Sequence, residues 1–540
     1  MKTNHSGLLG VGLVALLALA ACSDTNTPYG GAQAEATSST PPPAPYAKMA
    51  ERSAISGMMA PAPRPVLDAE KYRDVPLNSV KRVADDPVST FSIDVDTASY
   101  ANMRRFLNDR QLPPRDAVRV EELVNYFDYD YPRPTSAETP FRATTTLLRS
   151  PWSKDRQILH IGVQGFDIPQ GEQPPLNLVL LVDTSGSMHS EDKLPLAKKA
   201  LDLLIDQLDK GDHVAIVAYA GSAGEVLSPT KGNEKRKIRA ALNELQSGGS
   251  TAGGQGLALA YALAEENFDK DAVNRVILLT DGDFNVGIND PEKLKDFVAE
   301  KRKSGIYLST YGFGRGNYND AMMQAIAQTG NGTAGYIDTM QEARKLLRDD
   351  LAGSLFPIAD DVKIQIEFNP AVVSEYRLIG YETRMLNRED FNNDKVDAGE
   401  VGSGASVTAL YEITPVGAKM SSDPLRYQSE KEAAPVKGAE LAFLKIRYKQ
   451  PGKDVSKLIE QPVSAESINS VAEAPEATRW ALAVAGFGER LRGSPWIGDD
   501  FGFETIRSLA QKARGEDEFG LRAEFVQLVR TAESAKSVNE

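Results

Sequence analysis

The central part of the chain alternates between short apolar runs and amphipathic stretches. Residues 178–182 and 276–279 are apolar at every position, which is typical of strands buried on both faces of a sheet. The stretches between such runs have the apolar spacing of helices that cover a sheet, at 194–208, 235–245, 257–267, 291–303 and 321–328. The pattern predicts a doubly wound α/β domain with a mostly parallel sheet over residues 176–355.

Strand signals of another kind flank this domain on both sides. Before it they lie at 91–95, 141–148 and 158–163, with helical stretches at 100–107 and 118–127. After it they lie at 362–368, 407–413 and 441–448, followed by helical stretches at 478–491, 503–513 and 521–531. Strands on both sides of an α/β unit favour a β-sandwich that the unit interrupts, with a C-terminal helical segment. Three independent domains in series are the alternative.

The N-terminus has the pattern of a secretory signal peptide. Lys2 precedes an apolar run over residues 8–21, which is too short for a spanning helix, and Cys22 follows it. The stretch Leu19-Ala20-Ala21-Cys22 resembles the lipobox of bacterial lipoproteins, in which the cysteine thiol is acylated after cleavage. We therefore expect a signal peptide at 1–21 and a lipid on Cys22 that attaches the protein to a membrane. The alternative is an ordinary secretory signal with a cysteine near the cut.

The residues after Cys22 indicate where the protein is held. By resemblance to outer-membrane lipoproteins, Ser23 favours export to the outer membrane, with the body in the periplasm or at the cell surface. Residues 22–76 are rich in Ala, Pro, Ser and Thr, and such a composition predicts a disordered tether. No later stretch is apolar and long enough to span a bilayer, so the lipid is the expected anchor.

Length and composition limit the remaining possibilities. A chain of 540 residues is too long to fold around one hydrophobic core. We therefore expect separate regions at 87–175, 176–355 and 356–540 after the tether. The formal charge of -14 argues against a nucleic-acid partner, because contact with phosphates needs a basic surface. The single cysteine excludes a disulfide framework or a cysteine-rich zinc site within one chain.

Candidate chemistry follows three elements of the α/β domain. Asp183-Thr184-Ser185-Gly186-Ser187 comes directly after the first buried strand, Thr251 lies in a glycine-rich segment, and Asp281 follows another buried strand. The carboxyl ends of parallel strands form the crevice in which open α/β sheets bind ligands. Carboxylate and hydroxyl oxygens suit a hard divalent cation, of which Mg²⁺ is the one expected here.

These residues resemble the metal-ion-dependent adhesion site (MIDAS) of von Willebrand factor A (VWA) domains. Its motif is Asp-x-Ser-x-Ser, then a Thr and an Asp from two further loops, and Asp183, Ser185, Ser187, Thr251 and Asp281 fill every position. The resemblance implies that Ser185, Ser187 and in some states Thr251 bind metal directly, while Asp183 and Asp281 act through water or orient the hydroxyls. The alternative is that Asp183 caps a helix and Thr251 lies in a plain glycine loop.

The chain as a whole resembles the YfbK-like family of bacterial VWA lipoproteins, over about residues 87–531. Residues 91–100 and 390–400 carry the resemblance outside the α/β domain. In the first, Asp96 or Thr97 is expected to cap the helix that follows. The second begins like a calcium loop, but Lys395 replaces the required glycine and Val401 replaces the bidentate glutamate. Hairpin or turn chemistry is therefore predicted for both segments rather than a metal site.

The expected function is binding rather than catalysis. A membrane-anchored lipoprotein would hold a protein partner through the metal, because mostly neutral direct ligands leave the cation free to attract an acidic side chain. A metal-dependent hydrolase is one alternative, although the predicted ligands lack a nearby His or Glu as general base. The other alternative is a scaffold in which the metal only stabilises the domain. A phosphate-binding loop is excluded, since no Gly-Lys-Ser/Thr ends the glycine-rich segment.

Overall fold

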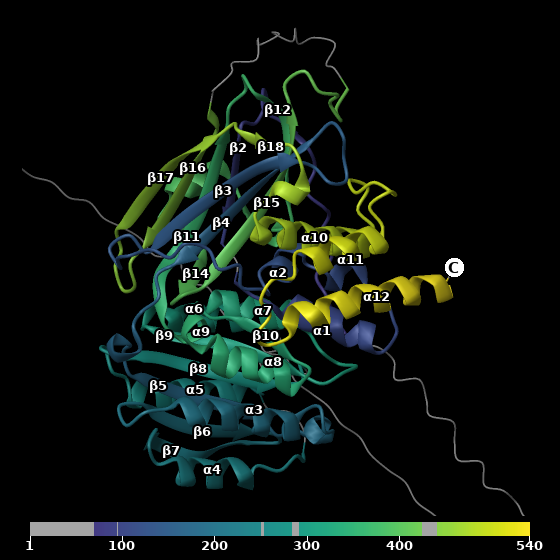
Figure 1. Cartoon of the computed structure of the whole chain (residues 1–540). Helices are drawn as coiled ribbons and strands as arrows, with labels where there is room; N and C mark the ends of the chain where they lie inside the picture. Colours follow the sequence, from purple (N-terminus) through teal and green to yellow (C-terminus); the bar gives the residue numbers. More distant parts are fainter. Residues whose placement is uncertain (1–69, 94, 250–252, 283–290, 424–439, 540) are drawn as a thin grey trace, which may run out of the picture. The chain divides into compact units, whose positions relative to one another are not determined.

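Three six-stranded sheets organise the chain in the computed structural model, which describes residues 70–93, 95–249, 253–282, 291–423 and 440–539 (Figure 1). One sheet forms the centre of an α/β domain. The other two pack against each other through a shared apolar core. Among the described residues, no helix has the length and hydropathy needed to cross a bilayer.

The sheet of the α/β domain has the strand order β10-β9-β8-β5-β6-β7. All neighbours are parallel except β6 and β7, so the prediction of a mostly parallel sheet is confirmed. Every residue of β5 and β8 is buried, as their unbroken apolar runs predicted. The six strands are β5 (Leu176–Asp183), β6 (His213–Tyr219), β7 (Ala223–Lys231), β8 (Val273–Thr280), β9 (Ile306–Phe313) and β10 (Ala334–Ile337).

Helices cover both faces of this sheet, because successive side chains of a strand point to opposite sides. Leu178 and Leu180 of β5 share an apolar cluster with α3 (Leu194–Gln207) and α4 (Lys235–Glu244). Val179 and Leu181 share another with three helices on the opposite face, α5 (Gly253–Glu266), α6 (Pro291–Lys303) and α7 (Asp320–Thr329). The doubly wound arrangement is therefore confirmed.

The other two sheets contain strands from both sides of the α/β domain. The first has the order β1-β12-β15-β4-β3-β18, with β1 (Lys81–Arg82), β12 (Val373–Ile379), β15 (Ser406–Pro415), β4 (Gln157–Gly165), β3 (Phe141–Arg149) and β18 (Ser467–Ile468). The second has the order β13-β2-β11-β16-β17, with β14 pairing β11; the strands are β13 (Met385–Leu386), β2 (Val88–Ser92), β11 (Pro357–Phe368), β16 (Glu440–Lys449), β17 (Ser456–Ser464) and β14 (Gly399–Gly402).

The α/β domain therefore interrupts a β-sandwich, and the alternative of three domains in series is wrong. Strand β4 precedes the domain and pairs with β15 after it, while β2 pairs with β11 in the same way. Across the sandwich, the rings of Phe141 and Tyr448 meet edge to face with centroids 5.4 Å apart. Those of Phe368 and Tyr411 do the same at 5.3 Å, so the two sheets share one aromatic-rich core.

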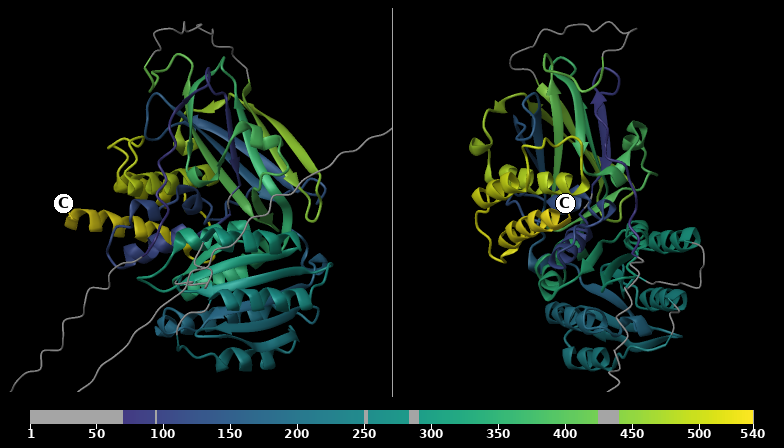
Figure 2. Two further views of the ribbon diagram at one scale, coloured as in Figure 1. Left: turned by 180° about the vertical axis from the view of Figure 1, so that it is seen from behind. Right: turned by 90° about the vertical axis from the view of Figure 1, so that its right-hand side faces the viewer.

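A helical layer covers the outer face of the first sandwich sheet. It combines α1 (Ala98–Asn108) and α2 (Val120–Val124) with the C-terminal α10 (Glu476–Arg492), α11 (Phe503–Lys512) and α12 (Leu521–Asn539) (Figure 2). Its core includes Trp480 and Phe525, together with Leu148, Ile158 and Leu410 from the sheet. The predicted C-terminal helices are thus confirmed.

Buried ion pairs connect this layer to the α/β domain. The fully buried guanidinium of Arg104 on α1 binds Asp338, Glu342 at 2.7 Å and Glu524 of α12 at 3.2 Å. Asp338 and Glu342 follow β10, so a single side chain joins three regions of the sequence. A buried arginine in such a position is costly to remove, because its carboxylate partners would lose their counter-charge.

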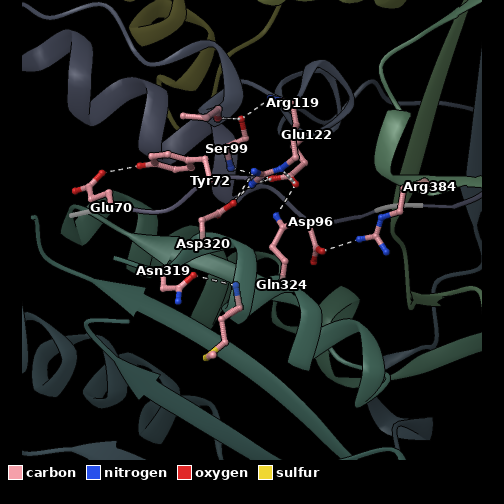
Figure 3. Close-up of polar contacts among 12 residues, drawn as sticks. Glu70, Tyr72, Asp96, Ser99, Arg119, Glu122, Asn319, Asp320, Gln324 and Arg384 are labelled. Atoms are coloured by element: carbon pink, nitrogen blue, oxygen red, sulfur yellow. Dashed lines mark hydrogen bonds and ion pairs between the residues drawn. The ribbon is translucent and has the colours of Figure 1, made fainter. Parts of the chain in front are cut away.

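A second polar cluster corrects the prediction for the start of α1. Thr97 is the N-cap residue but makes no side-chain capping bond, and Asp96 instead accepts the Ala334 N–H of β10 at 2.8 Å. The N–H of Ser99 is capped by Glu122 from α2, at 2.8 Å (Figure 3). The capping group comes from 23 residues away, which local spacing could not reveal.

Residues 70–76, assigned to the tether by composition, belong to the described structure. The Lys71 N–H donates to the Tyr318 carbonyl at 3.0 Å, and Glu70 accepts the Gly316 N–H at 2.9 Å and pairs with Arg105 at 2.6 Å. The predicted start of order at residue 87 is therefore too late. The contacts that hold this segment are individual hydrogen bonds and an ion pair. Such contacts produce no hydrophobic periodicity from which an ordered segment could be predicted. The signal peptide and residues 22–69 lie outside the described residues.

We expect residues 356–540, expressed alone, to aggregate rather than fold. Without the preceding sequence, β15 loses β4 and β11 loses β2, which leaves open edges and an exposed apolar face. Solubility and urea unfolding followed by circular dichroism would test this, with residues 70–540 as the control. A soluble fragment that unfolds cooperatively would contradict the interdependence of the two halves.

His160 on β4 should make stability fall in mild acid. Its ring nitrogens contact Tyr131 and Thr478, both at 2.8 Å, and burial lowers the pKa of the imidazole to about 3. In the unfolded chain the imidazole binds a proton with the ordinary histidine pKa of about 6.5. The free energy of unfolding therefore decreases as pH falls from about 6.5 toward 3, because only the unfolded state is protonated in this range. His160→Gln should remove about 2 kcal/mol of the stability difference between pH 7 and pH 5. Urea unfolding at both pH values measures it, and His189→Gln, an exposed histidine, should keep the wild-type difference.

Candidate metal site

The register of β5 against β8 brings two predicted site residues to one edge of the sheet. Val182 lies opposite Leu279, so that Asp183 ends one strand beside Thr280, the last residue of the other. Asp281 follows immediately. Because the two strands are parallel neighbours, both carboxylates lie at the carboxyl end of the sheet, as the sequence predicted.

The two predicted serine ligands lie within hydrogen-bonding distance of each other. The chain leaves β5 into a short 3₁₀ turn, Gly186–His189, and places the Ser185 and Ser187 hydroxyls 3.0 Å apart. Ser185 is buried, whereas Ser187 is exposed, so the pair opens from the interior toward solvent. Two adjacent hydroxyl oxygens of this kind suit direct coordination of a hard cation.

Asp183 is a fully buried carboxylate whose described hydrogen-bond donors are all neutral. It accepts the Ser185 N–H at 2.9 Å and the hydroxyls of Tyr219 at 3.2 Å and Thr280 at 2.8 Å. Burial raises the pKa of this carboxyl above its ordinary value, and the hydrogen bonds offset that rise only in part. A buried negative charge held by neutral donors fits a site that receives a cation.

Asp281 is buried as well, but a cation from the chain itself faces it. The Lys193 ammonium lies 2.9 Å from Asp281 Oδ2 and 3.1 Å from Asn317 Oδ1. Burial acts to raise the pKa of the Asp281 carboxyl, yet hydrogen bonds from Lys193 and Asn317 and the lysine charge bring it below its ordinary value. The two carboxylates of the site therefore differ in how their charge is compensated.

The third predicted loop reaches the site from the glycine-rich segment. The Gly186 N–H donates to the Gly249 carbonyl at 3.0 Å, and the Gly248 N–H donates to the Thr184 carbonyl at 2.8 Å. Gly249 has a φ of +83°, a conformation that favours glycine. Thr251 itself lies outside the described residues, as does the lipidation residue Cys22. Gly248 and Gly249 nevertheless contact the loop that carries Ser185 and Ser187.

The donor set suits a cation bound by hydroxyls with carboxylates behind them. In the described ranges, no group of three or more His, Cys, Asp or Glu could hold a metal. A metal bound at this edge of the sheet would be held by Ser185 and Ser187, with Asp183 and Asp281 behind them. The four described residues of the predicted set do lie together, and their oxygen chemistry fits Mg²⁺ or a similar ion.

Sequence reasoning missed the residues that support these four. Lys193, Tyr219, Thr280 and Asn317 contact the two carboxylates but lie outside the recognised motif. Thr280 directly precedes Asp281, and that adjacency was the one available signal. Lys193 sits at the start of a predicted helix, where a lysine is ordinarily solvated, and a contact 88 residues away leaves no local trace.

The remaining candidate segments carry no metal cluster in the part of the chain that the structure describes. Residues 388–392 form a 3₁₀ turn with a capping box between Asn387 and Asp390, and Asp394 binds Arg447 at 2.8 Å. The prediction of turn chemistry here is confirmed. The described partner of His189 is Ser247, at 3.2 Å, and not either serine of the motif.

Comparison with family models defines the class of protein. A model of the von Willebrand factor type A domain matches residues 177–349, and a von Willebrand factor model matches residues 66–160. The α/β unit is therefore a VWA domain. A third model, described as "Uncharacterized protein YfbK, C-terminal", matches residues 353–535.

Most of the chain is similar to YfbK of Escherichia coli K12. The two are 46% identical over 477 residues, which cover 87% of this chain and 82% of the relative. The chain belongs to the YfbK family, as its sequence predicted. It is also 26% identical over 265 residues to the inter-alpha-trypsin inhibitor heavy chain H3 of Pongo abelii, covering 46% of this chain and 30% of that one.

Solved structures include further similar chains. A von Willebrand factor type A protein from Catenulispora acidiphila is 18% identical, with a TM-score of 0.41, over 73% of this chain and 91% of that one. Proximal thread matrix protein 1 from the mussel byssus, solved with a zinc-occupied MIDAS motif, is 24% identical with a TM-score of 0.28. That match covers 33% of this chain and 45% of the mussel chain.

Proposed function

We propose that the protein is a lipid-anchored binding protein that holds a partner through a divalent cation in its VWA domain. The observation that carries this proposal is the cluster of Asp183, Ser185, Ser187 and Asp281 at the ends of β5 and β8. Mg²⁺ is the cation we expect. The partner is a protein that presents an aspartate or glutamate side chain.

The hydroxyls and the carboxylates of this cluster have different roles in the proposal. The Ser185 and Ser187 hydroxyls, with Thr251 in some states, would hold the cation directly. The Asp183 carboxylate accepts the backbone N–H of Ser185 and so holds the loop of this serine. Asp183 and Asp281 also supply negative charge behind the hydroxyls. When bound, the cation supplies positive charge and a coordination position that a carboxylate can occupy. Neutral direct ligands leave that charge incompletely balanced, which favours an acidic partner.

Two alternatives make different demands on the same residues. A metal-dependent hydrolase needs a general base near the serine loop, and the nearest histidine in sequence, His189, is exposed and contacts Ser247. We therefore propose a protein without catalytic activity. A scaffold in which metal only stabilises the fold would need no access from solvent. The exposure of Ser187 favours a site that a partner can reach.

Anchoring through Cys22 completes the proposal. A lipid on this cysteine, followed by a Pro-rich tether, would hold the VWA domain at a distance from the outer membrane, in the periplasm or at the cell surface. A folded domain that a tether holds away from the lipid anchor suits a protein that captures partners near the membrane.

Asp183→Asn should abolish binding of Mg²⁺ while the protein stays folded. The amide keeps the shape of the carboxylate but removes the buried charge behind the serine hydroxyls. Calorimetric titration with Mg²⁺ measures the affinity, and Asp192→Asn, on the same loop, is the matched control. Unchanged affinity in Asp183→Asn would overturn the assignment of the site.

Removal of the metal and a substitution at Thr251 distinguish a binding site from a scaffold. Capture of protein partners from membranes should require Mg²⁺, cease with EDTA and be weakened by Thr251→Ala. Partner capture that persists in EDTA would leave the metal a structural role.

Cys22→Ser should release the protein from the membrane, because a serine hydroxyl cannot form the thioether to the lipid. Detergent partitioning and membrane fractionation measure the change. Ser23→Asp is the control: it keeps the cysteine, so the protein should stay lipidated but shift toward the inner-membrane fraction. A Cys22→Ser variant that fractionates like the wild type would contradict lipid anchoring.

A further inference from the structure

Lys193 places a positive charge inside the candidate metal site. It lies directly before α3, only 8% of the residue is exposed, and its ammonium contacts Asp281 and Asn317 at 2.9 and 3.1 Å. A lysine is rarely buried to this degree unless it is paired. The pairing carboxylate is one of the two that the metal site requires.

The fold provides a path for this side chain. Gly314, with a φ of +73°, follows β9, and a Cβ at this position would overlap the Cγ, Cδ and Cε atoms of Lys193. Tyr336 donates its hydroxyl to the Gly314 carbonyl at 2.5 Å, which holds the glycine against the lysine stem. A side chain at residue 314 would push the ammonium away from Asp281.

The loop that carries Asn317 is held from outside the VWA domain. Glu70, labelled in Figure 3, accepts the Gly316 N–H at 2.9 Å, and the Lys71 N–H donates to the Tyr318 carbonyl at 3.0 Å. These contacts fix the second partner of the lysine ammonium. The position of Lys193 is therefore determined by the glycine on one side and by a braced loop on the other.

We infer that Lys193 is a resident cation that competes with the divalent metal for Asp281 and thereby sets the metal affinity of the site. The inference rests on the metal site of the proposed function and adds a residue that its motif does not include. In the metal-free protein, the ammonium balances one of two buried carboxylates and stabilises the fold. When a divalent cation enters, Asp281 is shared between two positive groups, and Lys193 weakens the binding.

This role separates two effects that a purely structural lysine would couple. Loss of the ammonium removes a positive charge 2.9 Å from the buried Asp281 carboxylate, so the metal-free protein becomes less stable. The same loss changes the formal charge of Asp183, Asp281 and Lys193 together from -1 to -2, which strengthens attraction for Mg²⁺. Stability and metal affinity therefore move in opposite directions. A lysine that only positioned Asp281 would lose both together.

Lys193→Met, which keeps the stem but removes the charge, should bind Mg²⁺ about tenfold more tightly than the wild type. Its metal-free thermal midpoint should fall, and saturating Mg²⁺ should recover more of that loss than in the wild type. Calorimetry with Mg²⁺ alone, on the full-length protein in detergent, measures the affinity. Lys199→Met removes one exposed charge from α3, the helix that Lys193 precedes, and should leave the Mg²⁺ affinity within about twofold.

Lys193→Gln gives a second measurement if the methionine variant folds poorly, because its amide can still donate to Asp281 without a charge. Equal or weaker Mg²⁺ binding in both variants, with binding intact in the wild type, would overturn the inference and leave the proposed site standing. If Mg²⁺ binds to the two Lys193 variants but not to the wild type, the result would support competition between Lys193 and the metal for Asp281. If wild type and variants all fail to bind Mg²⁺, the proposed metal function itself is wrong, and the inference falls with it.

Discussion

The parallel pairing of β5 with β8 is the constraint on which the site depends. Both strands are buried along their whole length. Because successive side chains of a strand point to opposite faces, a shift by one residue would turn every side chain to the other face of the sheet. The apolar packing of two helical layers fixes the register at Val182 and Leu279. That register places Asp183 beside Thr280, which donates to it at 2.8 Å, and brings Asp281 to the same edge. The polar site is thus positioned by apolar packing below it.

The sandwich and the VWA domain depend on each other through buried charge as well as chain connectivity. Arg104 joins α1, the segment after β10 and α12, while Arg119 joins α2 to Asp320 at the start of α7 at 2.6 Å. Burial of a guanidinium is tolerated because several carboxylates share it. Since α7 follows the loop of Asn317, the helical layer supports one edge of the candidate metal site. The regions outside the VWA domain therefore help to shape its site.

Elements whose signal is local were predictable from the sequence, and those whose partners are distant were not. The unbroken apolar runs gave β5 and β8, and helical spacing gave α3 to α7. Strand β7 was missed because it is an antiparallel edge strand, with polar residues such as Glu225 and Ser228 exposed along it. The four described site residues were predictable because strand ends and motif spacing place them. Lys193 was not predictable, since its partner Asp281 is 88 residues away in the sequence. The contact also requires a glycine at residue 314, where a Cβ would overlap the lysine stem.

The two carboxylates of the crevice show how the fold tolerates charge before any partner is bound. Asp183 is surrounded by neutral donors, and burial raises its pKa, so its charge is the unbalanced one. Asp281 keeps a lowered pKa despite its burial, because the ammonium of Lys193 and the amide of Asn317 face it. Two buried carboxylates without either arrangement would repel each other and cost the fold several kcal/mol. One internal cation limits that cost at Asp281, and it leaves Asp183 and the serine pair to the divalent cation of the proposed function.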